Sequence, residues 1–398
     1  MNAFDLAPAA VVRIAGWPLD ALEQFAAPDL AARAASVDAD DAVALTAYED
    51  AYRQTLEGQR WHLWRVTAGD PRFRCAVALS SPSLASQLKD GTPPARRNKR
   101  TRHLEKSLYR YLARAVARIE PYGLWTGVTL AEFRPEETTC VSPCAARTHF
   151  APELGPFRAL LRALGQREPY RSRGPYRLNP TLQVVDQQRW CYAHRRADGT
   201  LCWRDLPPSP AWEVLQSRLA SLQPGSLPEL QRRLAELLPA EVAGSLLDFA
   251  LKAGLLVGGL QLPAQFESPW DALEQTEARL EGPEGRAWSD ARGSIERTCE
   301  QLERYIEALF SEVDAPESEH RAATAAEPVF RANTAVREAI EALARVLSLP
   351  CPAMPHSVLR CDLAAPFRIQ LGQGDRQRLI SLLEDWAHLE KQYGAAKR

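Results

Sequence analysis

The chain has 398 residues, 45% of them hydrophobic, and a formal net charge of −1, which is typical of a globular protein of two or three domains and excludes a disordered chain. No apolar run is long enough to span a bilayer, and the amino terminus lacks the basic segment of a signal peptide, so we expect a cytoplasmic protein. The eight cysteines are scattered and no set of Cys and His has zinc-ligand spacing, so we expect incidental thiols and no metal site.

Residues 1–170 predict a mixed α/β domain. We expect strands at 11–18, 73–79 and 128–133, and helices that begin at Leu22 or cover 43–56, 82–88 and 157–164. In the segment Ser81-Pro82-Ser83-Leu84, Ser81 is expected to cap the short helix and Pro82 to open it. Capping explains these serines better than a nucleophile does, because no Gly-x-Ser-x-Gly turn surrounds them.

A cationic helix is expected between residues 96 and 119. Five basic residues recur there every four positions: Arg102, Lys106, Arg110, Arg114 and Arg118. Each such step turns a helix by only about 40°, so the five side chains form one slowly winding row, which we call the basic stripe. Glu105 is the only acidic residue between Arg96 and Arg118, so the stripe is not neutralised locally. This pattern favours a polyanionic partner over an ordinary solvated helix face.

A second module is predicted for residues 171–262. Three short strands at 182–185, 189–194 and 200–204 precede three helices at 211–222, 226–237 and 240–253 and a closing strand at 254–257. This order of elements is typical of a winged-helix-like domain. Asn179, which precedes Pro180, is interpreted as a turn residue rather than as a ligand contact.

Residues 263–398 predict a mainly helical region. Its helices are expected at 270–280, 291–310, 335–347 and 375–390, with one strand at 358–363 and an acidic loop at 312–328. Taken together, the three regions predict an α+β fold.

Several motifs of the chain resemble the amino-terminal part of the lantibiotic dehydratases. The segment from Arg110 to Leu124 resembles the family pattern R-Y-x-x-R-x-x-x-R-x-T-P-F/Y-G-L. Weaker landmarks follow in family order: Val12-Arg13 with Pro18-Leu19, Ser81-Pro82-Ser83-Leu84, Asn179-Pro180-Thr181-Leu182 and Asp362-Leu363. The chain is thus identified as a truncated or split member of this family.

The resemblance implies an enzyme that takes glutamyl-tRNA as its co-substrate, needs no other cofactor, and transfers glutamate to Ser or Thr hydroxyls of a ribosomal precursor peptide. It implies that the catalytic site contains Arg13, Arg114, Arg118 and Glu120. The tRNA would be bound through its phosphates by Arg96, Arg97, Lys99, Arg100, Arg102, Lys106 and Arg110. The winged-helix-like module would bind the leader of the precursor as an added strand, in a groove between 200–204 and 240–253.

Arginine suits this chemistry for two physical reasons. Transfer of an acyl group from an ester to a hydroxyl is nearly isoenergetic, so the enzyme needs mainly to position the reactants and to stabilise a developing oxyanion. A guanidinium stays charged and binds phosphate or ester oxygens in a bidentate manner, so it serves both purposes.

Two departures from the family pattern leave alternatives open. Glu120 occupies the position of a family threonine, where its carboxylate can pair with Arg118 or repel the donor. The rest of the glutamylation domain and the elimination domain do not follow Tyr393-Gly394, so we expect a second chain to supply them, or a lost or changed activity. The alternatives are a non-catalytic subunit that recognises precursor peptides and a relative that uses aminoacyl-tRNA to extend a peptide. Asp362 is interpreted as the partner of a nearby arginine.

Overall fold

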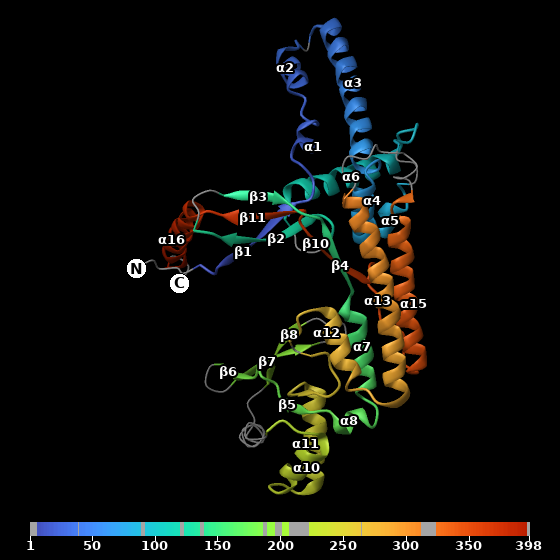
Figure 1. The fold of residues 1–398 in the computed structure, drawn as a ribbon, viewed down its shortest axis with the longest axis vertical. Helices are drawn as coiled ribbons and strands as arrows, with labels where there is room; N and C mark the ends of the chain where they lie inside the picture. Colours follow the sequence, from blue (N-terminus) through green and yellow to red (C-terminus); the bar gives the residue numbers. More distant parts are fainter. Residues whose placement is uncertain are drawn as a thin grey trace. The chain divides into compact units, whose positions relative to one another are not determined.

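A computed structural model describes residues 6–38, 40–88, 92–119, 123–135, 139–185, 189–195, 201–206, 223–263, 265–311 and 324–395. The chain divides into unit 1, which comprises 1–152, 295–336 and 355–398, and unit 2, which comprises 153–294 and 337–354. Each unit thus combines segments that are distant in sequence, whereas the sequence predicted three consecutive regions with boundaries at 170 and 262. The fold is α+β, as predicted (Figure 1).

Unit 1 is built on a six-stranded mixed sheet. Its strands are β1 (Ala9–Ala15), β2 (Thr126–Phe133), β3 (Cys140–Pro143), β4 (Arg147–Pro152), β10 (Leu359–Ala364) and β11 (Phe367–Leu371). The order β3-β11-β2-β10-β4 places β2 at the centre, and β1 pairs antiparallel with the other edge of β2. The strands predicted near 11–18, 128–133 and 358–363 are confirmed as β1, β2 and β10, and the other three are additional.

Two strands from the carboxy-terminal part of the chain share one edge of β2. Strand β10 pairs in parallel with Gly127 and Val128, and β11 pairs in parallel with residues 131–133. Between them the N–H of Ala365 donates to the carbonyl of Val128 at 2.9 Å. A Cβ atom at Gly127 would lie 3.0 Å from the Cβ of Ala365. Glycine at position 127 therefore permits the close approach of Ala365, which lies between the end of β10 and the start of β11.

The two faces of this sheet differ in character. One face packs into the core through buried residues that include Ala131, Phe150, Cys361 and Leu363. Because side chains alternate along a strand, the opposite face carries polar and charged residues that are exposed or half-buried: Arg13, Glu132, Arg147, Asp362 and Arg368. We call this second surface the polar face.

Strand β4 forms an edge of the sheet, and two glutamates of helix α13 (Gly282–Ser311) satisfy its free donors. The N–H of Thr148 donates to Glu307 Oε1 at 2.9 Å, and the N–H of Phe150 donates to Glu303 Oε1 at 2.6 Å. These contacts close an edge that would otherwise present unpaired backbone groups. Burial raises the pKa of the Glu303 carboxyl above its usual range, although the N–H of Phe150 acts in the opposite direction.

The helices of unit 1 are α1 (Asp20–Glu23), α2 (Pro28–Ser36), α3 (Ala42–Thr67), α4 (Pro71–Ser80), α5 (Pro82–Ala85), α6 (Lys99–Ala117) and α16 (Gln373–Ala395), together with parts of α13 and α15 (Glu327–Val346). The strand predicted at 73–79 is wrong, because these residues lie in α4. Asp70 caps this helix by accepting the N–H of Arg72 at 2.8 Å. All side chains of 73–79 are buried, and a continuous apolar run does not distinguish a buried helix from a buried strand. Ser81 precedes α5, but its side chain makes no capping hydrogen bond, so the predicted cap is also wrong.

Three aromatic residues join β1, α4 and β2 in the core of unit 1. The ring of Phe73 lies 5.5 Å from Trp17 and 5.1 Å from Trp125, both in edge-to-face geometry. Trp17 Nε1 donates to Asp70 Oδ2 at 2.9 Å, and Trp125 Nε1 donates to Ser80 Oγ at 2.7 Å. The carboxylate that caps α4 therefore also fixes the segment that follows β1.

Unit 2 contains the segment predicted as a winged-helix-like module. Its elements are α7 (Leu154–Leu164), α8 (Tyr170–Arg173), β5 (Tyr176–Leu178), β6 (Gln183–Val185), β7 (Arg189–Arg195), β8 (Leu201–Leu206), α10 (Leu227–Ala235), α11 (Ala240–Ala253), β9 (Leu256–Gly258) and α12 (Pro269–Glu277). Strands β6, β7 and β8 form an antiparallel sheet, and β9 pairs with β5. The helix predicted at 211–222 lies outside the described residues.

One hydrophobic core joins these strands and helices. Tyr192, Leu230, Leu234 and Leu247 are all buried in it. Asn179 is buried beside them, and its Nδ2 donates to the carbonyls of Ala193 and Gly254 at 2.9 and 3.0 Å. Asn179 is therefore a structural residue, as interpreted from the sequence.

The carboxy-terminal region contains more than the predicted helices. Helices α12, α13, α15 and α16 match the prediction, but β10 and β11 belong to the sheet of unit 1. In the acidic segment predicted as a loop at 312–328, residues 312–323 lie outside the described part of the chain, and Glu327 already begins α15. Within the described residues, no helix is long and apolar enough to cross a membrane.

We expect two substitutions of Glu303 to differ in their effect on stability. Glu303→Gln keeps an oxygen that accepts the N–H of Phe150 and removes a buried charge, so the free energy of unfolding at pH 7 should stay unchanged or rise. Glu303→Ala leaves that N–H unpaired, which should cost about 1–3 kcal/mol. Urea unfolding followed by circular dichroism measures both values.

The pH dependence provides the control. A carboxyl whose pKa is raised by folding makes the chain lose stability as the pH rises from the unfolded-state pKa through the folded-state pKa. The stability difference between wild type and Glu303→Gln should therefore shrink as the pH falls through the raised folded-state pKa, and should be lost below about pH 4. Equal losses for Gln and Ala at pH 7 would contradict this account.

Candidate functional site

Helix α6 presents three cations of the basic stripe to solvent. The helix begins after Asn98, whose side chain accepts the N–H of Thr101 at 2.9 Å. On its surface Arg102, Lys106 and Arg110 are exposed, and none of them has a hydrogen-bonding or ion-pairing partner within the described ranges. On the buried side Leu108 and Leu112 pack into the core. These three cations, which we call the exposed row, are available to a polyanion.

The stripe does not continue as one helical row, which corrects the prediction. Arg114 is half-buried and is engaged with other groups of the chain. Arg118 follows the helix in an extended conformation, with φ −116° and ψ 136°. Its carbonyl accepts a hydrogen bond from Thr126 Oγ1 at 3.5 Å, at the first residue of β2. Glu120 lies outside the described residues, so its catalytic role stays a prediction.

Glu105 does not neutralise the exposed row, because two other arginines occupy it. Arg60 Nε donates to Glu105 Oε1 at 2.6 Å, and Arg97 Nε donates to Glu105 Oε2 at 2.9 Å. The side chains of Arg60 and Glu105 are 7% and 8% exposed, so this is a buried ion pair that holds α3 against α6. Arg97, predicted to bind tRNA, thus also has a structural role at the start of α6.

The other predicted tRNA-binding residues lie at the beginning of the same helix. Arg96, Lys99 and Arg100 are all exposed. Arg100 Nη2 donates to Gln87 Oε1 at 3.3 Å. These cations extend the positively charged surface beyond the amino-terminal end of the exposed row.

Arg13 and Arg118 reach the same end of β2. Arg13 is exposed on the polar face and stands opposite Val128 in the pairing of β1 with β2. Thr126, which contacts the Arg118 carbonyl, lies two residues before Val128, a separation of about 7 Å along a strand. Sequence positions more than 100 residues apart are thereby brought together, as a shared site requires.

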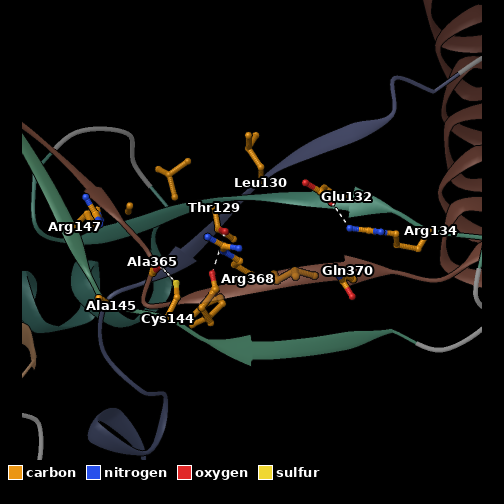
Figure 2. Close-up of a pocket in the computed structure, with 14 residues that line it drawn as sticks. Thr129, Leu130, Glu132, Arg134, Cys144, Ala145, Arg147, Ala365, Arg368 and Gln370 are labelled. Atoms are coloured by element: carbon orange, nitrogen blue, oxygen red, sulfur yellow. Dashed lines mark hydrogen bonds and ion pairs between the residues drawn. The ribbon is translucent and has the colours of Figure 1, made fainter.

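A cavity of ≈ 610 Å³ continues from this point across the polar face (Figure 2). Its wall includes Val128, Glu132, Arg134, Arg147 and Arg368. Glu132 and Arg134 form an ion pair at 3.0 Å. Arg147 and Arg368 have no ion-pair partner in the part of the chain that the structure describes. The cavity therefore carries an excess of positive charge.

The sequence analysis did not identify these two arginines. Arg147 opens β4 and Arg368 lies in β11, and both strands are additional to the predicted ones. Polar and apolar residues alternate over 367–371, which is the pattern of a half-buried strand and could have indicated β11, whereas residues 147–149 are all polar and give no such signal. Asp362 pairs with Arg360 at 3.7 Å, as interpreted from the sequence.

Unit 2 has a separate feature that bears on peptide binding. Strand β8 is an edge strand, with β7 as its one partner strand among the described residues. Leu201 and Trp203 on β8 are 64% and 63% exposed, and Val242 and Phe249 on α11 are also exposed. An open edge with apolar side chains is the kind of surface to which an extended peptide adds as a strand.

An exposed row of cations and a cationic cavity on one α+β scaffold are the features expected of a protein with a polyanion surface and a small-ligand site. Residues 69–384 match the family described as "Lantibiotic dehydratase, N terminus", and the chain belongs to this family.

Two solved structures are similar to the chain. One is the tRNA-dependent lantibiotic dehydratase MibB from Microbispora sp. 107891, with 21% sequence identity and a TM-score of 0.53. The match covers 81% of this chain and 29% of MibB. The other is the glutamylation domain of TbtB from thiomuracin biosynthesis, at 19% identity and a TM-score of 0.49, which covers 95% of this chain and 51% of that domain. The chain thus spans less than a third of MibB and about half of the TbtB domain, and no curated protein matches it.

We expect removal of the exposed row to weaken binding of a structured RNA such as tRNA. In the triple variant Arg102→Ala, Lys106→Ala, Arg110→Ala, each lost phosphate contact should reduce the slope of log K against log salt concentration by about 0.7–0.9. Fluorescence anisotropy with labelled tRNA at several salt concentrations measures this slope. Arg33→Ala, an exposed cation on α2, is the matched control and should leave the slope unchanged. An equal effect of the control and the triple variant would refute a specific role for the row.

Proposed function

We propose that this chain forms the amino-terminal part of a tRNA-dependent glutamylation enzyme that acts on ribosomal precursor peptides in the cytoplasm. The co-substrate is glutamyl-tRNA, and the acceptor is a Ser or Thr hydroxyl. The observation that carries the proposal is the meeting of Arg118 and Arg13 at one end of β2 beside a cationic cavity, with Arg118 just beyond the helix that bears the exposed row. Membership of the family supports the reaction class, and MibB, which shares the fold, is described as tRNA-dependent.

The reaction requires mainly that the protein position the reactants and stabilise the developing negative charge. The acceptor hydroxyl attacks the carbonyl carbon of the glutamyl ester, the bond to the tRNA ribose oxygen breaks, and the hydroxyl proton passes to that ribose oxygen. One ester replaces another, so the barrier lies in the tetrahedral intermediate and its oxyanion. Arg118 contacts the first residue of β2 and Arg13 stands opposite Val128, and we assign these two cations to this oxyanion and to the terminal phosphate of the tRNA.

The remaining steps need further polypeptide. The chain covers 29% of MibB and 51% of the TbtB domain, so elimination of glutamate is assigned to protein outside this sequence. We propose a partner chain as its source. A precursor leader would bind unit 2 along the edge of β8, next to the exposed side chains of Leu201 and Trp203.

A second function is favoured by unit 2 alone. The open edge of β8 supports a non-catalytic subunit that binds precursor peptides and presents them to other enzymes. This alternative needs no affinity for tRNA. The two proposals therefore differ in one measurable property, the salt-sensitive binding of aminoacyl-tRNA by the purified chain.

We expect Arg118→Ala to lower glutamyl transfer by at least about 100-fold, because one oxyanion contact contributes about 3–4 kcal/mol. The assay combines the chain and its partner polypeptide with labelled glutamyl-tRNA and precursor peptide, and mass spectrometry detects the ester. Affinity for the leader should stay at the wild-type value, which shows that the variant is folded. Unchanged transfer would contradict the role of Arg118. A product that retains an amide-linked amino acid would instead identify a peptide-extending relative.

We expect Trp203→Ala to lower the affinity for the leader peptide by about tenfold, because an exposed aromatic residue on a receptor strand is a typical binding hot spot. Fluorescence anisotropy with a labelled leader measures the loss. Binding of tRNA should not change, since Trp203 lies in unit 2 and the exposed row lies in unit 1. The matched control is Leu237→Ser, which removes an exposed apolar side chain of unit 2 outside the predicted groove and should leave the affinity unchanged, whereas no loss in Trp203→Ala excludes β8.

A further inference from the structure

The cavity on the polar face has a charge imbalance that tRNA phosphates on α6 do not account for. Three guanidinium groups and one carboxylate line it. The carboxylate of Glu132 is already paired with Arg134 at 3.0 Å. On the neighbouring strand β10, Asp362 is paired with Arg360 at 3.7 Å. Two cations, Arg147 and Arg368, are thus left with no anionic partner among the described residues.

The other residues of the cavity limit what the ligand can be. Val128 and Leu130, on the polar face of β2, supply apolar wall. Two polar side chains of the wall already donate to backbone carbonyls: Thr129 Oγ1 to Phe367 at 3.1 Å and Cys144 Sγ to Ala365 at 3.7 Å. A volume of ≈ 610 Å³ is within the usual range for a small-molecule site. These features together fit an anion carried on a short aliphatic stem.

The arrangement of the arginines fits the same ligand. In Figure 2, Arg147 and Arg134 lie toward opposite ends of the cavity, and Arg368 lies between them beside Thr129. A guanidinium binds a carboxylate through two parallel hydrogen bonds. An arginine in the cavity would therefore prefer a ligand with a carboxylate to the corresponding ligand with an amide. Arg368 is therefore the residue best placed to distinguish the two.

The cavity also begins close to Arg118, the residue proposed to bind the end of the tRNA. Arg118 contacts Thr126, and Val128, two residues further along β2, is already part of the cavity wall. If Arg118 holds the end of the tRNA, as in the proposed function, the group attached to that end lies at the mouth of the cavity. What enters the cavity is then the group attached to that terminus rather than another phosphate.

We propose that this cavity binds the side-chain carboxylate of the glutamyl group, and that Arg368, assisted by Arg147, selects glutamyl over glutaminyl donors. This inference rests on the proposed function and adds the subsite that recognises the side chain of the transferred amino acid. Arg368 is a specificity-determining residue in this account, because it contacts the side chain of the donor and not the ester that reacts.

The test uses two stable analogues of the donor terminus. In both, the 3′ oxygen of adenosine is replaced by nitrogen, which carries glutamate in one analogue and glutamine in the other through an amide. Isothermal titration calorimetry on the full chain should show tighter binding of the glutamyl analogue by about tenfold or more, since a charge-assisted bidentate contact is lost with the amide. Arg368→Gln should abolish this preference by weakening the glutamyl analogue alone. Arg368→Lys, which keeps the charge without the fork, should retain part of it.

Two further variants test folding and charge. Arg33→Gln, on α2, should match the wild type with both analogues. Glu132→Gln releases Arg134 from its ion pair and adds positive charge to the cavity, so affinity for the glutamyl analogue should stay the same or rise. A fall in that affinity would contradict the proposed electrostatics.

Three results would overturn the inference: equal binding of both analogues by the wild type, no effect of Arg368→Gln, or equal weakening of both analogues, which would place a phosphate or the ribose near Arg368 instead. Failure of the proposed function has a different signature. Transfer from glutamyl-tRNA by the wild type, without any change of donor preference in Arg368→Gln, overturns only the subsite. Selective analogue binding without any transfer overturns only the proposed reaction.

Discussion

The fold of unit 1 depends on one strand, β2, that accepts partners from both ends of the chain. β1 occupies one edge, and β10 and β11 divide the other, where Gly127 lets Ala365 approach the backbone. The pairing with β1 joins residues more than 100 positions apart, and the pairings with β10 and β11 join residues more than 200 apart, so the sheet forms only when the whole chain has assembled. No local segment could create the polar face, because each strand contributes only one or two of its side chains.

The division of that edge also creates the site. A single strand along all of β2 would leave a flat surface, whereas the change from β10 to β11 turns the chain at residues 365–366 and opens a concavity on the polar face. The opposite face has no such freedom, since Phe150, Cys361 and Leu363 are buried there. The arginines of the cavity therefore rest on a rigid, well-packed sheet. Rigid support of this kind favours selectivity over adaptability in a binding site.

The elements that the sequence predicted correctly are those with a clear local period. Helix α6, strand β2 and helix α11 each show an apolar spacing that fits one structure only, and the family motif ends at the turn before β2. The run 73–79 lacks such a period, which is why its assignment as a strand is wrong. Arg118 has the spacing of a helical residue, but the helix ends at Ala117. The carbonyl of Arg118 instead accepts a hydrogen bond from Thr126, which lies beyond the turn. No local period indicates Arg147, and the alternation over 367–371 predicts a strand at Arg368 but not its neighbours, so the pairing of β4 and β11 with distant strands is what places both arginines at the cavity.

Pairing, rather than composition, explains how a chain of net charge −1 presents a cationic surface. Many of its arginines are neutralised within the fold: Arg60 and Arg97 by Glu105, and Arg134 by Glu132. The exposed row of α6 and the two arginines of the cavity lack such partners among the described residues, and all of them lie in unit 1. Over distances beyond about 8–10 Å, salt screens the acidic residues elsewhere, so the local excess decides which ligand approaches. The same local excess of positive charge would attract any polyanion. Selectivity for one amino acid requires the cavity in addition, because the cavity combines an arginine with an apolar wall.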